Sequence, residues 1–150
     1  MRILLGVTAG IAAYKVPFLI RLLVKQGAEV RCVMTPDARD FVSPLVLSTL
    51  SNHPVAIEFW NKETGAWNNH VALAEWADLL VICPCTANTL SKMASGACDN
   101  LLLAIFFRCA TKLFCFLLWI WKCIGTPPFK ETWTSCSRMV PLLFRLNTEN

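Results

Sequence analysis

The 150-residue sequence has few charged side chains and lacks several patterns that would assign it to a class of protein. Only 16% of its residues are charged and 55% are hydrophobic, which excludes wholesale disorder. The apolar region 101–124 contains no uncharged run longer than the nine residues 113–121, whereas a membrane span needs ~18. No G-x-G-x-x-G string or internal repeat is present, and the length corresponds to one domain, so a multidomain enzyme is not expected.

Metal-binding patterns are also missing. Cys83 and Cys85 have a C-x-C spacing, but no second Cys or His pair follows at the distance typical of a zinc finger. We therefore predict no metal site. The eight cysteines lie largely in apolar runs such as 81–85, which favours reduced core thiols over a secreted disulfide framework. This predicts a cytoplasmic protein.

The composition changes near residue 104. Residues 1–104 contain eight basic and eight acidic side chains, whereas residues 105–150 contain six basic and two acidic ones, so the whole net charge of +4 lies there. Residues 105–150 also hold four of the eight Cys, three of the six Trp and one of the six Gly. We therefore divide the chain into a domain at 1–104 and an aberrant basic, Cys/Trp-rich tail at 105–150. Because the positive net charge lies outside the domain at 1–104, it does not indicate that this domain binds nucleic acid or a membrane, and we expect neither partner.

Strand and helix patterns alternate along residues 1–93. Strands are predicted at 2–7, 28–34 and 77–83, with a further short strand near 55–59, and helices are predicted at 11–26, from 35–37 onward, and after 86. This alternation favours an α/β fold, a parallel sheet with helices on both faces. The first residues also have the composition of a signal peptide, an alternative that explains fewer residues than a buried strand does.

Two details of the predicted helices are specific. The helix at 11–26 follows from side chains that recur at helical spacing: Ile11, Tyr14, Phe18, Leu22 and Lys25. The next helix is predicted to open at Thr35-Pro36-Asp37, with Thr35 as its N-cap and Pro36 at its first position.

Small and hydroxyl-bearing residues follow three of the predicted strands. These are the turn at 6–10, which includes Gly10, then Thr35, and then Thr86, Asn88 and Thr89. Taken singly, each is explained as well by an ordinary tight turn or helix cap. The carboxyl ends of parallel strands meet at one edge of a sheet, however, and helix N-termini there favour anions. Jointly, these residues predict a phosphate-bearing cofactor.

His70 lies at a loop edge near the same crevice, after Asn68-Asn69. Its imidazole could act as a base or orient a carboxylate, and a surface or capping role is the alternative. His53, beside Asn52 and Pro54, is typical of a turn and is given no role.

Three segments carry a family resemblance. They are GVTAGIAAYK at 6–15, AEVRCVMTPDARDFVSPLVLSTLS at 28–51 and NNHVALAEWADLLVICPCTANTLSKMASGACDNLLLA at 68–104. In this order they closely resemble the flavodoxin-like cysteine decarboxylase family, most of all the phosphopantothenoylcysteine decarboxylase domain of bifunctional coenzyme A biosynthesis proteins. The resemblance implies a three-layer flavodoxin-like (Rossmann-like) fold. It also implies that FMN is held by Gly10, Ile11, Ala12, Thr35, Thr86, Asn88 and Thr89. His70 would be the active-site histidine. Ala9 and the string 83–86 depart mildly from the family pattern.

The family mechanism implied by this resemblance begins with oxidation of the substrate's cysteine side chain by the flavin. The carboxylate then leaves as carbon dioxide, and the reduced flavin returns its electrons to give a thiol. The implied reaction is decarboxylation of phosphopantothenoylcysteine to phosphopantetheine, and the implied assembly is a homo-oligomer, a trimer or larger. The alternatives are a peptidyl-cysteine decarboxylase or flavin prenyltransferase of the same superfamily, and a non-catalytic flavin-binding or regulatory subunit.

The resemblance stops after Ala104. The family would continue there with a strand, a Pro-Ala-Met-Asn or Pro-Ala-Met-Asp motif and a Gly-rich substrate clamp, and none is recognisable. If the codons of residues 117–129 are read from one nucleotide earlier, they can encode the missing motif. The codons of residues 143–150, shifted in the same way, can encode the run into the clamp, and the spacing between the two is unchanged. We therefore infer a one-nucleotide slip near codons 104–107, with a naturally divergent tail as the alternative. The slip implies a fold incomplete at its C-terminus that binds FMN poorly and has no turnover.

Overall fold

The computed structural model describes residues 1–61, 63–109 and 112–115, with side chains through residue 109. Its four-stranded sheet has the order β2-β1-β3-β4, and every neighbouring pair is parallel. The strands are β1 (Arg2–Val7), β2 (Glu29–Met34), β3 (Leu79–Ile82) and β4 (Lys112–Cys115). The helices are η1 (Ile11–Lys15), α1 (Val16–Lys25), η2 (Pro36–Asp40), α2 (Pro44–Ser51), α3 (His70–Trp76), α4 (Ala87–Ser95) and α5 (Leu101–Arg108).

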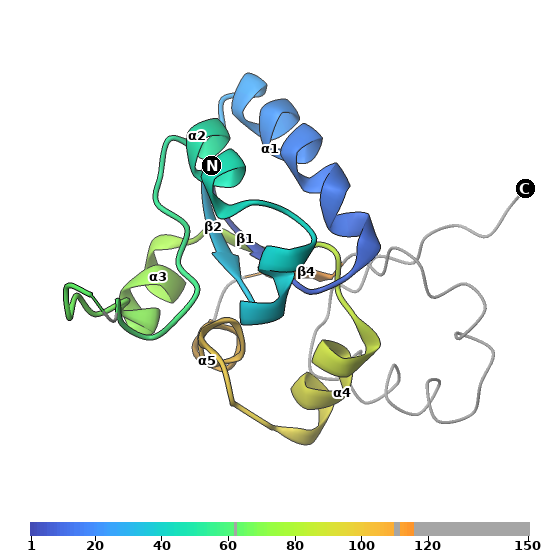
Figure 1. Ribbon diagram of the computed structural model, residues 1–150, viewed down its shortest axis with the longest axis vertical. Helices are drawn as coiled ribbons and strands as arrows, with labels where there is room; N and C mark the ends of the chain where they lie inside the picture. The colour runs from blue at the N-terminus through green and yellow to red at the C-terminus, as the bar shows by residue number, and fades with distance from the viewer. Residues whose placement is uncertain (62, 110–111, 116–150) are drawn as a thin grey trace, which may run out of the picture.

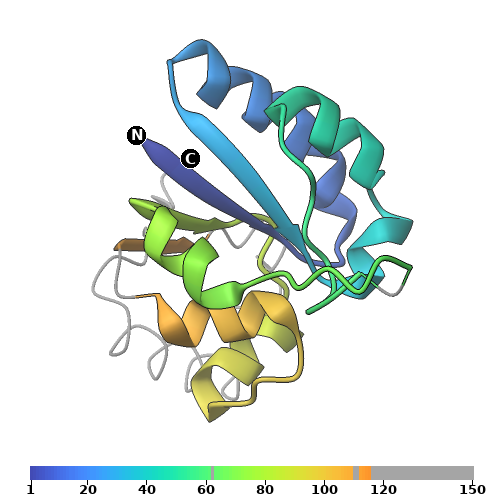
Figure 2. The same ribbon diagram turned by 90° about the vertical axis from the view of Figure 1, so that its left-hand side faces the viewer.

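The sheet is covered by helices on both faces, which confirms the predicted three-layer α/β fold (Figures 1 and 2). Successive side chains of β1 point to opposite faces, as the strand geometry requires. Ile3 and Leu5 pack with α1 and α2, whereas Leu4 packs with α3, α4 and α5. Because β1 lies between β2 and β3, its residues 3–7 are almost completely buried. This explains its continuous apolar sequence.

The first predicted helix starts five residues too early. Residues 11–15 form the 3-10 helix η1, and the α-helix α1 begins only at Val16. The physical reason is Pro17, which lies in the first turn of α1. Its ring has no N–H to donate and would clash with the carbonyl of Ala13 in a continuous α-helix.

The side chains that predicted this helix face solvent rather than the core. Ile11, Tyr14, Phe18 and Leu22 are each 57–66% exposed. The buried side of the same segment consists of smaller or β-branched residues, including Val16 and Ile20. Apolar side chains therefore lie on two sides of η1 and α1, and the exposed set is called the η1–α1 stripe below.

The predicted strand at 55–59 is reduced to a single bridge. The Ala56 N–H donates to the carbonyl of Cys32 (3.1 Å), and its own carbonyl accepts the N–H of Met34 (2.9 Å). Val33 and Ala56 form an isolated parallel bridge at the outer edge of β2. The segment therefore covers this edge of the sheet without extending it by a full strand.

The region after Ala104 differs from the sequence expectation. α5 continues through Ala104 to Arg108, and Ile105 is completely buried in the core. A strand was expected to be missing here, yet β4 pairs in parallel with β3, from Leu79↔Lys112 to Ile82↔Cys115. Backbone pairing at a sheet edge makes few demands on the side chains, so composition could not exclude it. The predictions made for residues 116–150 lie outside the described residues.

Close packing fixes the distance between α5 and the central strand. A Cβ atom added to Gly6 of β1 would lie only 2.6 Å from Cδ1 of Leu102, which is itself completely buried. The glycine is thus needed for close approach. No helix in the described part of the chain is long and apolar enough to cross a membrane.

Candidate functional site at the carboxyl edge of the sheet

Three loops meet at the carboxyl edge of the sheet, as predicted. Gly6 of β1 lies in register with Val33 of β2 and with Ile82 of β3, so the three strands end at the same level. Thr35 begins the loop after β2, and its N–H donates to the carbonyl of Val7 (2.9 Å). The loops at 8–10, at 35 and at 83–86 therefore form one continuous rim.

Thr8 connects the first loop to the third. Its hydroxyl donates to the carbonyl of Pro84 (2.7 Å) and accepts the N–H of Thr86 (3.1 Å), and the side chain is only 1% exposed. The sequence suggested a hydroxyl at this turn but not this cross-link. Since both sites on the Thr8 hydroxyl are used, its role is to join the two loops rather than to bind a ligand.

Gly10 lies beside the third loop and leaves space there. A Cβ at this position would contact Cγ2 of Thr86 at 3.6 Å and Cγ of Pro84 at 3.7 Å, which are ordinary van der Waals distances. The backbone of Gly10 is extended, with φ of −155°, so its conformation does not demand glycine. Neither packing nor conformation explains the glycine, whereas a ligand that approaches the backbone between the two loops would.

Thr35 is placed at the rim but does not cap a helix. The predicted N-cap hydrogen bond is absent, because η2 is a short 3-10 helix and the Ala38 N–H bonds to the Thr35 carbonyl instead (3.0 Å). The Thr35 hydroxyl is buried and has no hydrogen-bond partner among the described residues. An unsatisfied buried hydroxyl is unfavourable, and its position at the rim suits a ligand that supplies the missing partner.

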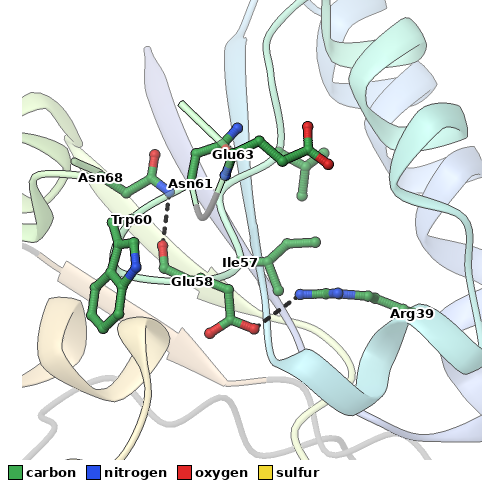
Figure 3. A pocket seen from close by; sticks show the side chains of 8 residues that line it. Arg39, Ile57, Glu58, Trp60, Asn61, Glu63 and Asn68 are labelled. Atoms are coloured by element: carbon green, nitrogen blue, oxygen red, sulfur yellow. Dashed lines mark hydrogen bonds and ion pairs between the residues drawn. The ribbon is translucent and has the colours of Figure 1, made fainter. Parts of the chain in front are cut away.

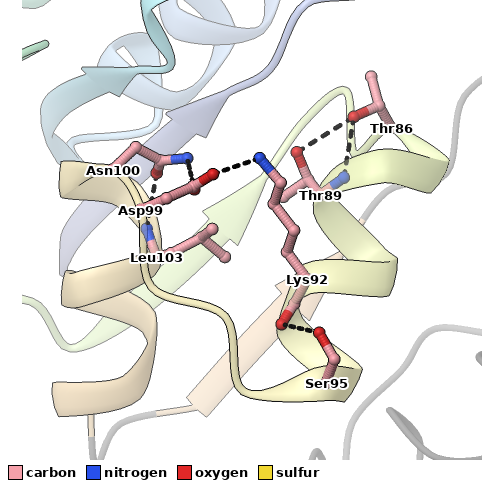
Figure 4. A network of polar contacts seen from close by, with 7 residues as sticks. All are labelled: Thr86, Thr89, Lys92, Ser95, Asp99, Asn100 and Leu103. Atoms are coloured by element: carbon pink, nitrogen blue, oxygen red, sulfur yellow. Dashed lines mark hydrogen bonds and ion pairs between the residues drawn. The ribbon is translucent and has the colours of Figure 1, made fainter.

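The start of α4 forms the third part of the rim (Figure 4). The Thr86 hydroxyl caps this helix by accepting the Thr89 N–H (3.3 Å) and lies 3.1 Å from the Thr89 hydroxyl. Asn88 is exposed in the same turn. Thr86 thus has the capping role that was its alternative explanation. Free N–H groups of the first turn and the helix dipole still favour an anion at this end.

Ile11 and Ala12 follow Gly10 at the start of η1. The Ile11 side chain is 57% exposed, whereas Ala12 is buried at 4% against the core. The turn between Gly10 and Ala13 is closed by the Ala13 N–H, which donates to the Gly10 carbonyl (2.8 Å).

His70 is the first residue of α3, and its position follows from the topology. α3 leads into β3, and Asp78 beyond its end donates its N–H to the Arg2 carbonyl at the amino edge (2.9 Å). The helix therefore begins at the carboxyl edge. Asn69 caps it by accepting the N–H groups of Val71 (3.0 Å) and Ala72 (3.1 Å).

The imidazole of His70 is half-buried and only partly satisfied. Its ring meets Phe59 edge-on, with 6.1 Å between centroids. Its Nδ1 atom is buried without a hydrogen-bond partner in the described ranges. No described hydrogen bond joins His70 to the three loops. The histidine therefore shares the edge with the rim and keeps a nitrogen available for a ligand.

The thiols near the rim are not arranged for metal binding. Cys83 is buried in the third loop, and this burial raises the pKa of its thiol to about 11. In the part of the chain that the structure describes, no three His, Cys, Asp or Glu side chains form a group able to hold a metal ion. Within the same residues Cys32, Cys83 and Cys98 are free thiols.

Curated relatives match about two thirds of the chain. The bifunctional coenzyme A biosynthesis protein CoaBC of Vibrio vulnificus (strain YJ016) is 43% identical over 101 residues, which cover 67% of this chain and 25% of that protein. CoaBC of Escherichia coli (strain K12) is 40% identical over 104 residues, covering 69% of this chain and 26% of that protein. The chain thus spans about a quarter of the length of these relatives.

Solved structures share the fold over most of the chain. The FMN-dependent cysteine decarboxylase SpaF is 29% identical with a TM-score of 0.82, covering 93% of this chain and 80% of that one. A variant of PPC decarboxylase complexed with pantothenoylaminoethenethiol is 30% identical with a TM-score of 0.74, covering 95% of this chain and 80% of that one. A family model, Flavoprotein, matches residues 1–118 and so extends beyond Ala104. The chain belongs to the Flavoprotein family.

Proposed function

We propose that this chain carries the FMN-dependent decarboxylation of phosphopantothenoylcysteine to phosphopantetheine in coenzyme A biosynthesis. The observation that carries the proposal is the 40–43% identity to CoaBC over 67–69% of this chain. The resemblance to a PPC decarboxylase structure at 30% identity supports the same reaction. The substrate is a small molecule with a carboxylate and a phosphate.

The residues at the rim fit FMN. The Thr35 hydroxyl lacks a partner, Gly10 leaves space beside Thr86, and the first turn of α4 favours an anion such as the flavin phosphate. Ile11, Ala12, Asn88 and Thr89 complete the set that would hold the cofactor. When bound, FMN supplies the oxidation of the substrate thiol and the later return of electrons.

His70 is proposed as the catalytic residue because it presents an unpartnered nitrogen at the same edge. It would bind and orient the substrate's carboxylate, or hold a proton beside it, while Phe59 limits the rotation of its ring. A half-buried position partly excludes water from this contact and strengthens it.

The experiment is a His70→Asn substitution in the protein with its reading frame restored, measured by release of carbon dioxide and by the flavin absorbance that remains after gel filtration. Turnover should be lost and most of the FMN retained, because the rim is built from other elements. The control is Gln26→Asn, which changes an exposed residue at the end of α1 that is given no role. Full turnover in His70→Asn would remove the histidine from the mechanism. Flavin without turnover in the frame-restored protein would instead favour a non-catalytic flavin-binding subunit.

We also propose that residues from about 105 onward were altered by a one-nucleotide slip. The codon agreement at two separate places supports this. The slip predicts that restoring the frame raises both FMN retention and turnover, and the nucleotide sequence around codons 100–110 tests it directly.

The proposed environment is the cytoplasm, and the proposed assembly is a homo-oligomer, a trimer or larger. The free thiols of Cys32, Cys83 and Cys98 support a reducing compartment. The exposed η1–α1 stripe supports self-association, because four large apolar side chains on one surface are costly to leave in water.

A further inference from the structure

A cavity of about 400 Å³ lies between the outer edge of β2 and the first turns of α3. The segment after His53 forms one wall, and Asn68 and Asn69, which immediately precede His70, form part of the other. Arg31 reaches the cavity from β2, and Leu73 contributes apolar surface from α3. Among the described residues that line this cavity there is no carboxylate, and the guanidinium of Arg31 is the only permanent side-chain charge.

Arg31 is held in place without being satisfied. Its guanidinium carbon lies 4.2 Å from the centroid of the Trp76 ring, a cation–π contact that fixes the plane of the group. Its Nε atom is buried and has no partner, and its nearest carboxylate is Glu29, with Nη2 to Oε1 at 3.7 Å. That separation is too long for a hydrogen bond. Within the described ranges, Arg31 thus carries a charge and several N–H groups but no hydrogen-bonded acceptor.

The neighbouring cavity shows what a satisfied arginine looks like in this fold (Figure 3). It has a volume of about 360 Å³ and is lined by Arg39, whose Nη2 lies 3.0 Å from Oε1 of Glu58. Glu63 lines it as well, so among the described lining residues carboxylates outnumber cations. An anion is therefore disfavoured beside Arg39 and favoured beside Arg31, although both arginines are about equally accessible, with side chains 46% and 35% exposed.

We propose that the Arg31 cavity binds a small molecule that carries a phosphate or carboxylate on an uncharged arm. The anion would pair with the guanidinium, which favours both groups through two parallel N–H donors. The amides of Asn68 and Asn69 and the apolar surface of Leu73 would contact the arm. The inference does not depend on flavin binding or on decarboxylation.

Glu29 provides a second test, in which the affinity of the cavity for an anion should rise rather than fall. Its Oε1 lies 3.3 Å from Nε2 of His53 and 3.7 Å from Nη2 of Arg31, so one carboxylate oxygen lies near both nitrogen groups at the cavity. Removing its charge should strengthen the field of Arg31 toward a bound anion. Glu29→Gln is thus expected to tighten binding, an effect that general damage to the fold would not produce.

The test is calorimetric titration of the full chain with phenyl phosphate at saturating FMN, so that the flavin site is already filled. Arg31→Gln should weaken binding about tenfold or more, because a charge-assisted hydrogen bond is lost. Glu29→Gln should tighten it several-fold, and the matched control Arg39→Gln should leave it within about twofold. Equal affinity in Arg31→Gln, or an equal loss in Arg39→Gln, would overturn the proposal, as would no gain in Glu29→Gln.

A competition arm identifies the source of the anion. Displacement of phenyl phosphate by phosphopantothenoylcysteine would assign the cavity to the acidic arm of the proposed substrate. Simultaneous binding of both would assign it to a separate acidic ligand. Either result supports the Arg31 site, and loss of decarboxylation with intact phenyl phosphate binding would count against the proposed function alone.

Discussion

Because the buried Thr35 hydroxyl has no described partner, its removal should raise the stability of the fold and weaken the binding of FMN. Thr35→Val keeps the shape of the side chain and removes a buried oxygen that has no described partner. Burying such a group costs about 1–3 kcal/mol, so the flavin-free protein should become more stable by about 1 kcal/mol. For a chain of this size that raises the melting temperature by about 2–4 °C. The dissociation constant of FMN should rise about tenfold, because its hydrogen bond to the hydroxyl is lost.

The two quantities are measured by calorimetric melting of the flavin-free protein and by titration of flavin fluorescence. Thr8→Val is the control, since that hydroxyl uses both of its bonds within the protein, to Pro84 and Thr86. It should destabilise the fold by about 2–4 kcal/mol. If Thr35→Val lowered the melting temperature as Thr8→Val does, or left FMN affinity unchanged, the assignment of Thr35 to the cofactor site would be wrong.

Three further predictions concern the rest of the molecule. The hydrogen bond and charge of Arg2 lower the pKa of Asp78 to about 2. This carboxylate therefore contributes stability above about pH 4 that is lost as the pH falls toward 2. Asp78→Asn should remove this part of the acid unfolding profile, and an unchanged profile would contradict the argument. Iodoacetamide at pH 8 should modify the exposed Cys98 and spare Cys83, whose thiol pKa is about 11, as seen by peptide mass spectrometry; equal labelling would refute the burial argument. Phe18→Glu should leave the melting temperature nearly unchanged, because the ring is 66% exposed, and should reduce the mass found by light scattering; an unaltered mass would exclude the η1–α1 stripe as the contact.

The central strands were predictable because their burial determines their sequence. β1 was predicted at its observed bounds, and β2 within one residue, since parallel strands covered on both faces require continuous apolar runs. The convergence of the rim loops followed from the same topology. The direction of a helix face was not predictable. α1 has apolar residues on two sides, and periodicity alone does not say which of them meets the sheet.

Side-chain partners in the candidate site were less predictable than its location. The sequence placed Thr35 and Thr86 at the same edge, but only the structure distinguishes a hydroxyl used as a cap from one left without a partner. Nothing in the sequence indicated that Thr8 joins two loops, because its partners lie 76 and 78 residues away. The strand at 112–115 was missed because its pairing depends on the backbone rather than on composition.

The contact between Gly6 and Leu102 ties the middle of the sheet to the candidate catalytic residue. α5 can approach β1 this closely only because residue 6 has no side chain, and α3 rests against α5. A methyl group at residue 6 would push α5 outward and carry α3, with His70 at its tip, away from the rim loops. The loops at 8–10 and 83–86 continue directly from β1 and β3 and would stay with the sheet. Turnover in this protein would then depend on a missing methyl group deep in the core, at a residue that touches neither cofactor nor substrate.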